Sequence, residues 1–350
     1  MRSVSHGRSG HARQCARRRL LLAALACTVL GGCIRRSPTQ VTIYTSLDPP
    51  YSQPVLQRFQ QETGILVNAK YDAEATKTTG LVNQLLAERR NPQADVFWNS
   101  EVARTLMLKD EGMFASYVSS AADDIPARFK DPEGYWTGFA ARARVLVYNT
   151  ELVPRERAPR SIFELTKPAW RGKVTLANPL FGTTGAHAAA LFVTLGSEAA
   201  KEYFRALKAN DVKITEGNAA VRDQVARGEV WVGFTDTDDV YAGKRAGKPI
   251  DIVFPDADGI GTLLIPNTVA LIANGPHPEH GKRLIDYLLS PQVEQALANA
   301  DSHQMPVRAG LAVPEGYASL AEVKAMEVTF DAIAQSMPES QAFLKELFIR

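Results

Sequence analysis

Short β-rich segments alternate with helical segments between residues 41 and 111, and this alternation constrains the fold more than any other feature of the sequence. Asp48-Pro-Pro50 ends the first β-rich run, while Gly64 and Gly112 each follow a segment whose apolar residues have helical spacing. The expected strands are 41–45, 65–67 and 95–98, and the expected helices are 54–63, 79–89 and 102–111. Strands that alternate with helices in this way predict an α/β fold built on a mainly parallel sheet.

The length of the chain predicts two lobes. About 318 residues follow residue 32, and a single hydrophobic core usually stops growing at roughly 250–300 residues. The expected later strands are 137–148, 173–177, 230–234 and 262–272, and the expected later helices are 185–195, 198–209, 219–227, 278–289 and 291–300. The apolar run 262–272 is interrupted by Pro266-Asn267-Thr268, and we expect it to cross between the lobes.

The first 32 residues read as a signal peptide. An arginine-rich stretch that includes Arg17-Arg18-Arg19 precedes an apolar run from Leu20 to Leu30, which is too short to span a bilayer. Leu30-Gly-Gly-Cys33 resembles the lipobox of bacterial lipoproteins, so Cys33 is the expected lipidation site and 33–40 the tether. An ordinary signal peptide with a chance cysteine is the alternative. Export to the periplasm or cell envelope, with membrane attachment through the lipid, is therefore expected.

Cysteine positions and charge exclude several classes of function. All three cysteines, Cys15, Cys27 and Cys33, lie in the expected leader or at its end, so the remaining chain has no disulfide, thiolate metal site or cysteine nucleophile. The chain has 40 basic and 38 acidic residues, but six arginines precede Cys33, which leaves 34 against 38 and a net charge of −4. This balance gives no support to a nucleic-acid-binding surface.

A series of short motifs gives the chain a family resemblance. In order, they are Val41-Thr-Ile-Tyr-Thr-Ser46, Phe59-x2-Glu62-Thr-Gly64, Ala94-Asp-Val-Phe-Trp98, Arg144-x3-Tyr148-Asn149, Trp170-Arg-Gly172, Thr184-Gly-Ala186, Gly228-Glu229 and Leu288-Leu-Ser-Pro291. Each motif is common by itself, but their joint order over roughly residues 40–320 resembles the solute-binding proteins of bacterial ABC importers, in the ferric-iron branch.

The resemblance implies a two-lobed periplasmic-binding-protein fold of type II. Each lobe would be a mixed, mainly parallel sheet flanked by helices, with hinge strands between the lobes. The expected first lobe comprises 41–140 and 268–320, and the expected second lobe 141–267 and 321–350. One ligand would lie in the cleft of a monomer that delivers it to an ABC transporter permease.

The stretch Gly233-Phe-Thr-Asp-Thr-Asp-Asp239 places Asp236, Asp238 and Asp239 after an apolar run. Asp236 and Asp239 have the spacing of a capping box, and acids in a first helical turn are favoured by the helix dipole. Capping does not account for all three carboxylates, which raise one another's pKa when they lie close together. A bound cation or amine would relieve that repulsion, so we expect a ligand role and a metal role for this cluster.

An anion site is expected at the start of the helix that follows Phe181. Its backbone N–H groups and the hydroxyls of Thr183 and Thr184 would donate to an anion. By resemblance, Thr184, Gly185, Ala186 and Asn218 would hold a phosphate-like synergistic anion. Simple helix capping is the alternative for each of them.

Two arginines share one face of the expected strand 137–148. Arg142 and Arg144 need a partner, because an unpaired buried charge is costly. An anionic ligand would suit either guanidinium, and so would an internal acid such as Asp95. The resemblance favours Arg142 as the residue that contacts the ligand.

The resemblance also shows where this chain departs from the ferric-binding pattern. Asp238 and Asp239 stand where those relatives carry adjacent tyrosines, and Asp236 stands where they carry asparagine. Asp48 matches a histidine ligand, and Ser100, with Glu101 next to it, matches a glutamate ligand. These departures exclude a tyrosinate ferric site but leave a carboxylate site for a hard cation. The residues expected to line the cleft from the first lobe are Ser46, Asp48, Ser100 and Glu101.

Three classes of function compete. The leading hypothesis is a lipid-anchored solute-binding protein that captures iron(III) or another hard cation, with a synergistic anion, by hinge closure. A binder of a phosphonate or phosphorylated small molecule for the same kind of importer is the alternative. A metal-dependent phosphoryl hydrolase is disfavoured, because the sequence has no nucleophile–base pair, P-loop spacing or two-histidine metal motif. A purely structural lipoprotein is disfavoured by the two-lobe pattern.

Overall fold

The computed structural model describes residues 1, 3, 39–72 and 79–348. The chain divides into two compact units, Met1–Thr39 and Gln40–Arg350, and the second unit holds the fold. Nearly all of the expected leader, and Cys33 itself, lie outside the described residues. In the part of the chain that is described, no helix is both long enough and apolar enough to cross a membrane.

A mixed sheet forms the centre of the second unit. Within the described residues its order is β2-β1-β3-β10-β5-β8-β6-β7, with β4 paired to β10 and β9 paired to β5. The strands are β1 Gln40–Thr45, β2 Leu66–Tyr71, β3 Val96–Asn99, β4 Phe114–Ala115, β5 Thr137–Asn149, β6 Val174–Ala177, β7 Lys213–Thr215, β8 Val232–Asp236, β9 Ile250–Val253 and β10 Leu264–Ile272. The parallel pairs are β1 with β2 and β3, and β6 with β7 and β8.

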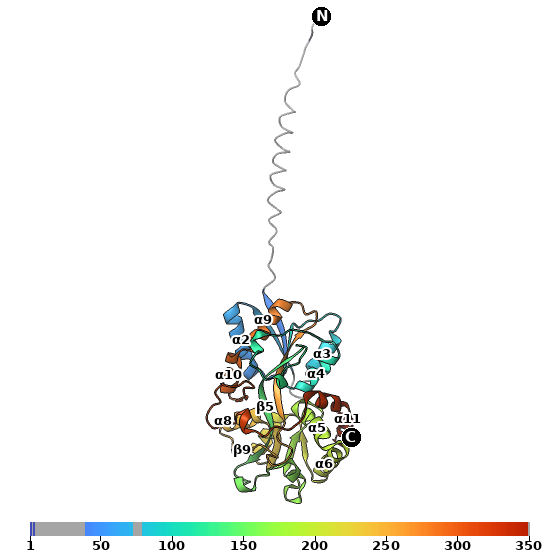
Figure 1. Cartoon of the computed structure of the whole chain (residues 1–350), viewed down its shortest axis with the longest axis vertical. Coiled ribbons are helices and arrows are strands. Elements are labelled where there is room, and N and C mark those ends of the chain that lie inside the picture. Colours follow the sequence, from blue (N-terminus) through green and yellow to red (C-terminus); the bar gives the residue numbers. More distant parts are fainter. Residues whose placement is uncertain (2, 4–38, 73–78, 349–350) are drawn as a thin grey trace. The chain divides into compact units, whose positions relative to one another are not determined.

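The long strand β5 joins the two lobes (Figure 1). Its first half pairs with β10 up to Ala143, and its second half pairs with β8 from Arg144 onward. In turn, β10 pairs with β3 of the first lobe. The lobe limits expected at residues 140/141 and 267/268 fall inside β5 and β10, which are the two strands that connect the lobes.

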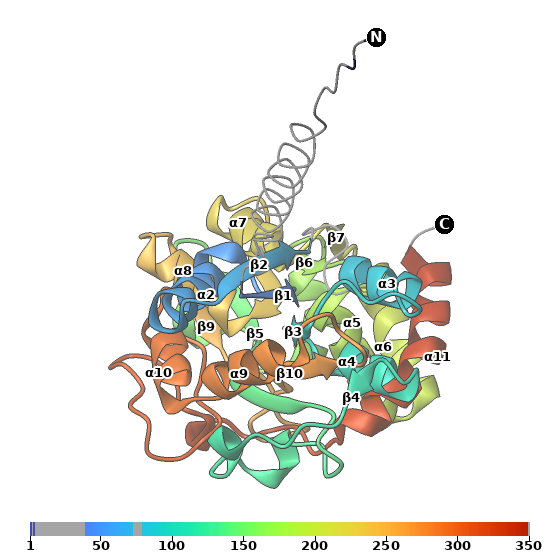
Figure 2. The same ribbon diagram turned by 90° about the horizontal axis from the view of Figure 1, so that it is seen from above.

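Helices cover both faces of the sheet in each lobe. They are α2 Pro49–Thr63, α3 Thr79–Ala87, α4 Val102–Asp110, α5 Gly182–Leu195, α6 Ser197–Ala209, α7 Asn218–Ala226, α8 Thr237–Arg245, α9 Pro278–Leu288, α10 Pro291–Asn299 and α11 Phe330–Phe348. In the first lobe, α9 and α10 lie on one side of the strands and α3 and α4 on the other (Figure 2). In the second lobe, α5, α6 and α11 cover one face and α7 and α8 the other.

Alternating side chains explain this layering. Val96 and Trp98 of β3 pack in one core with α2, α9 and α10, whereas Phe97 between them packs in another core with α3 and α4. All three side chains are fully buried. A strand with three consecutive apolar residues therefore serves two cores, as expected for a strand that is covered on both faces.

Two helices begin earlier than the sequence predicts. α2 begins at Pro49 and not at residue 54, because prolines are tolerated in a first turn where no intrahelical N–H bond is needed. α5 begins at Gly182 and not at Gly185, and Gly182 has a φ of 53°, which glycine adopts without strain. The sequence analysis did not include α11, which contacts α4 of the first lobe as well as α5 and α6 of the second.

A buried ion pair holds the crossing point of the two connecting strands. The β5–β10 register shifts between Pro266 and Asn267, opposite Ala140, whose φ is 43°. The Ala140 N–H donates to Glu294 Oε1 at 2.7 Å, and Arg308 Nε donates to Glu294 Oε2 at 2.6 Å. Glu294 is fully buried, so its carboxylate ties α10 to the irregular part of β5.

Glu294→Ala should destabilise the protein by about 3–5 kcal/mol, because it leaves the buried Arg308 guanidinium without this partner. The exposed Arg58–Glu62 pair provides a matched control, and Glu62→Ala should cost less than about 1 kcal/mol. Chemical denaturation of both variants measures the difference. Equal losses would contradict a structural role for Glu294.

Candidate functional site

One cavity collects most of the residues that the sequence singled out. It has an empty volume of about 510 Å³, open solvent included. The expected site residues that line it are Asp48, Ser100, Arg142, Thr183, Thr184, Asn218, Asp236, Asp238 and Asp239. Asp48 and Ser100 follow β1 and β3 of the first lobe, whereas the residues from 183 onward end or follow strands of the second lobe. The carboxylates near residue 238 and the start of α5 therefore border one cavity.

Helix N-termini converge on this cavity because the parallel strands end there. Asp48 is the N-cap residue of α2, Gly182–Thr184 form the first turn of α5, and Gly217 and Asn218 begin α7. Asp238 and Asp239 lie in the first turn of α8. The first N–H groups of a helix have no intrahelical acceptor, and the dipole favours negative charge at that end. The convergence stabilises carboxylates of the chain and would equally stabilise a bound anion.

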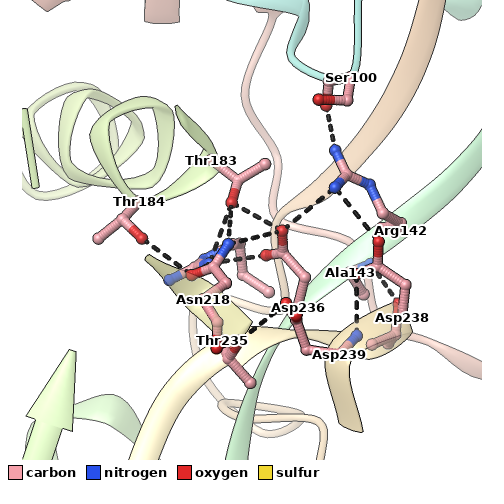
Figure 3. Close-up of polar contacts among 12 residues, drawn as sticks. Ser100, Arg142, Ala143, Thr183, Thr184, Asn218, Thr235, Asp236, Asp238 and Asp239 are labelled. Carbon is pink, nitrogen blue, oxygen red and sulfur yellow. Dashed lines mark hydrogen bonds and ion pairs between the residues drawn. The ribbon is translucent and has the colours of Figure 1, made fainter. Parts of the chain in front are cut away.

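Asp236 is held by donors from several elements (Figure 3). Its Oδ1 accepts from Arg144 Nη1 at 2.6 Å, and its Oδ2 accepts from Thr183 Oγ1 at 2.7 Å, Asn218 Nδ2 at 3.0 Å and Arg142 Nη1 at 3.4 Å. Arg144 and Asp236 are directly paired residues of β5 and β8, so the sheet register fixes the contact. The internal acid that satisfies the two arginines is thus Asp236, whereas Asp95 accepts from the Thr42 N–H.

The arginines determine the protonation of this carboxylate. Burial alone would raise the pKa of Asp236, but the nearby charges of Arg144 and Arg142 and the hydrogen bond from Thr183 lower it below its usual value. Burial likewise disfavours the charged form of Arg142, yet the carboxylates of Asp238, Asp236 and Asp239 raise its pKa. Both groups are therefore ionised at neutral pH.

Asp238 and Asp239 bring further negative charge to the cavity. Asp238 Oδ2 lies 3.4 Å from Arg142 Nη1, and Asp239 Oδ2 accepts from Thr235 Oγ1 at 3.0 Å. Together with Asp236, each of these residues offers a carboxylate oxygen that lies within 4.8 Å of those of the other two. Such a group of oxygens can hold a hard cation.

The capping box that the spacing of residues 236–239 offered as an alternative does not form. Asp236 occupies the N-cap position of α8, but its side chain makes no capping hydrogen bond. The carboxylate is instead directed to Arg144, Arg142, Thr183 and Asn218. The charge partners on neighbouring strands prevail over the local capping bond.

Two residues expected in the cleft do not line the cavity. Glu101 is fully buried and caps α4, since its carboxylate accepts from the Ala103 and Arg104 N–H groups. Burial raises the pKa of Glu101 despite these bonds. Ser46 is also buried: its hydroxyl donates to Asn99 Oδ1 and accepts from the Ser100 N–H, each at 2.7 Å. We expected Glu101 and Ser46 to line the cleft. In the structure, Glu101 instead holds the start of α4, and Ser46 holds Asn99 and Ser100.

The expected anion residues Gly185 and Ala186 also lie inside α5 and away from the cavity lining. The Gly185 N–H donates to the Phe181 carbonyl at 3.0 Å, so it is already satisfied. This correction follows from the earlier start of α5. The first-turn N–H groups belong to Gly182, Thr183 and Thr184.

Sequence reasoning missed Tyr51 and Arg222. Burial raises the pKa of Tyr51, and the charges of Asp238, Asp239 and Asp48 raise it further, while Arg222 lowers it. Tyr51 lies in the first turn of α2, where its N–H donates to the Asp48 carbonyl. Asp48-Pro-Pro50 is the sequence signal that could have revealed Tyr51, because prolines are common in the first turn of a helix. We expected this helix to begin only at residue 54 and therefore left Tyr51 out of it.

Comparison with known proteins identifies the family. Residues 91–336 match the family described as bacterial extracellular solute-binding protein. The chain is 25% identical to iron uptake protein A1 of a Synechocystis strain, over 88% of this chain and 86% of that protein. It is 26% identical to a putative 2-aminoethylphosphonate-binding periplasmic protein of Salmonella paratyphi A, over 90% of this chain and 94% of that protein.

A solved structure supports the fold. Iron-bound HitA from Pseudomonas aeruginosa superposes with a TM-score of 0.80 at 22% identity, over 89% of this chain and 100% of HitA. This confirms the expected two-lobed periplasmic-binding-protein fold of type II.

The chain belongs to the family of bacterial extracellular solute-binding proteins. The expected class, an exported binding protein of an ABC importer with a permease partner and a small ligand or ion, is confirmed. The family comprises binding proteins and not enzymes, which gives the hydrolase alternative no support.

Acid should lower the stability of the protein through His187, a buried residue of α5. His187 is buried, and its ring lies 4.7 Å from that of Phe234. Burial and the charge of Arg144 lower its pKa well below 6.5. Below pH 6.5 the unfolded chain therefore binds a proton that the native protein does not. The free energy of unfolding should fall with decreasing pH, by up to about 1.4 kcal/mol per pH unit from this residue.

Denaturant titrations between neutral and mildly acidic pH test this expectation. His187→Gln should reduce the slope of stability against pH, whereas His280→Gln, a change of the same kind in α9, should retain it. A slope unchanged by His187→Gln would contradict the assignment.

Proposed function

We propose that this protein captures a hard cation, with Fe(III) as the first candidate, and delivers it to its ABC permease. The observation that carries the proposal is the carboxylate group in the cavity. Asp236, Asp238 and Asp239 offer oxygens within 4.8 Å of one another. Carboxylate oxygens are suitable ligands for Fe(III), Mn(II), Ca(II) and Mg(II). The iron uptake function named for the Synechocystis relative supports the same cargo.

Closure of the two lobes would complete the site. Asp48 belongs to the first lobe, and Asp238 and Asp239 belong to the second, yet all three line the same cavity. A cation bound between them offsets their mutual repulsion and favours the closed state by its differential affinity. In this proposal Asp236 supports the site, because four donors already hold its carboxylate.

The synergistic phosphate-like anion that the resemblance predicts would compete with an internal carboxylate for its side-chain donors. The first turn of α5 supplies N–H groups at Gly182, Thr183 and Thr184 that could receive one. The side chains expected to help, Thr183, Asn218 and Arg142, donate to Asp236.

The second candidate cargo is a zwitterion, such as an aminoalkyl phosphonate. The cavity places helix N-termini beside carboxylates, so an anionic and a cationic group of one molecule would each find a complementary partner. The ligand named for the Salmonella relative has this chemistry.

A thermal-shift screen of the domain that begins at Gln40 tests the cargo. Fe(III) supplied as its citrate chelate, Mn(II), Ca(II), phosphate and 2-aminoethylphosphonate are the probes. A cation at 100 times its Kd should stabilise the protein by about 2.7 kcal/mol. Asp238→Asn combined with Asp239→Asn should abolish that shift.

The matched control for this screen is Asp211→Asn combined with Asp258→Asn, which changes two exposed aspartates. The control should keep the full cation response. A strong shift with 2-aminoethylphosphonate and none with any cation would replace the first cargo by the second. A cation shift that survives in the Asp238/Asp239 variant would refute the assigned ligands.

We also propose that the protein acts as a monomer anchored to the membrane by a lipid on Cys33. The Leu30-Gly-Gly-Cys33 motif supports the anchor. Cys33→Ser should move the expressed protein from the membrane fraction to the aqueous fraction in a detergent partition. Retention in the membrane fraction would exclude lipidation of Cys33 as the anchor.

A further inference from the structure

The donors around Asp236 form a set that would suit a free oxyanion. Two guanidinium groups, one hydroxyl and one amide N–H donate to its two oxygens at 2.6–3.4 Å. The carboxylate and Arg144 have no exposed surface, and Arg142 is 4% exposed. Figure 3 shows Asp236 between Thr183 and Asn218 on one side and Arg142 on the other.

Further polar contacts link members of this donor set to one another. Asn218 Nδ2 donates to Thr183 Oγ1 at 2.8 Å, and Thr184 Oγ1 donates to Asn218 Oδ1 at 3.3 Å. Arg144 Nη1 also lies 3.2 Å from both Thr183 Oγ1 and Asn218 Oδ1. A phosphate that used these side chains would have to displace a carboxylate bound to two arginines, and it would meet the negative charge of Asp236.

We propose that Asp236 is a built-in counter-anion: it occupies the donor set of Arg142, Arg144, Thr183 and Asn218, so that the cavity binds its cation without a free phosphate-like anion. The inference rests on the proposed cation cargo and deepens it. It also makes a phosphonate cargo less favourable, because the phosphonate group would compete with Asp236 for the same donors.

The sheet explains why position 236 suits this role. Asp236 is the last residue of β8 and faces Arg144 across the β5–β8 ladder. Its side chain is therefore delivered to the arginine by the register, and no movement of the lobes is needed to bring the two charges together. A free anion would lose translational and rotational entropy on binding at the same position, whereas the aspartate is already held there by the chain.

The first test uses inorganic phosphate and the protein without added cation. Wild type should show no change in Tm up to millimolar phosphate. Asp236→Ala removes both the charge and the atoms that fill the donor set, so phosphate should enter the positive field of Arg142 and Arg144. The Tm of this variant should then rise by a few degrees with phosphate. Asp211→Ala, on the surface, is the matched control and should respond to phosphate as wild type does.

A merely structural ion pair makes a different prediction. Both hypotheses predict that Asp236→Ala is less stable than wild type. If the ion pair is merely structural, however, phosphate will not restore the stability. A folded variant that does not respond to phosphate therefore overturns the proposal. If the variant does not fold without phosphate, refolding in its presence supports the proposal and failure to refold in either buffer contradicts it. A phosphate-dependent rise in the Tm of wild type also contradicts it.

The second test measures cation affinity, with Mn(II) or Fe(III)-citrate, in phosphate-free and phosphate-containing buffer. Wild type should bind equally in both. Asp236→Ala should gain affinity with phosphate by about 5-fold to 150-fold, the usual range of coupling between two ligands. A wild-type affinity that requires phosphate would overturn the counter-anion. If wild type binds no cation in either buffer, the cargo proposal fails, whereas the phosphate response of the cation-free protein still decides the role of Asp236.

Discussion

The buried contact between Asp236 and Arg144 is the interaction on which the rest of the site depends. The two residues face each other on adjacent strands, neither has exposed surface, and Arg144 Nη1 lies 2.6 Å from Asp236 Oδ1. Hydrogen bonds to the remaining polar atoms offset part of the cost of burying an ion pair. Thr183 at the start of α5 and Asn218 at the start of α7 supply those bonds. The ion pair is thereby linked to two of the helix N-termini that border the cavity, those of α5 and α7.

The same arrangement links the site to the lobes. Arg142, two residues before Arg144 on β5, contacts Asp236 and Asp238 in the second lobe and the Ser100 carbonyl that follows β3 in the first lobe. A single guanidinium thus connects the acidic cluster with the opposite side of the cavity. A ligand that changes the charge near Asp238 would change the contacts of Arg142. Because Arg142 lies on the connecting strand β5, ligand binding would be coupled to the arrangement of the two lobes.

Much of the fold followed from local patterns in the sequence, and the site followed from topology. The alternation of strands and helices indicated a mainly parallel sheet, and parallel strands place their carboxyl ends at one edge, which brought Asp48, Thr183 and Asp236 to one cavity. The partner of Arg144 was not readable, because pairing depends on the β5–β8 register. The starts of α2 and α5 were misplaced by several residues. Proline and glycine can mark either a loop or the first turn of a helix, so they did not show where each helix begins. The misplaced start of α2 hid Tyr51, whereas the assignment of the anion to Gly185 and Ala186 came from the family resemblance.

The central claim is that the acidic cluster beside the Asp236–Arg144 pair holds a cation. Anomalous diffraction from crystals of the domain grown with Mn(II) or Fe(III)-citrate locates such an ion directly. The account predicts an anomalous peak at roughly 2.0–2.6 Å from carboxylate oxygens of Asp238 and Asp239, with Asp236 still bound to Arg144. A peak elsewhere on the molecule, or none at these carboxylates with the cation in excess, would contradict it.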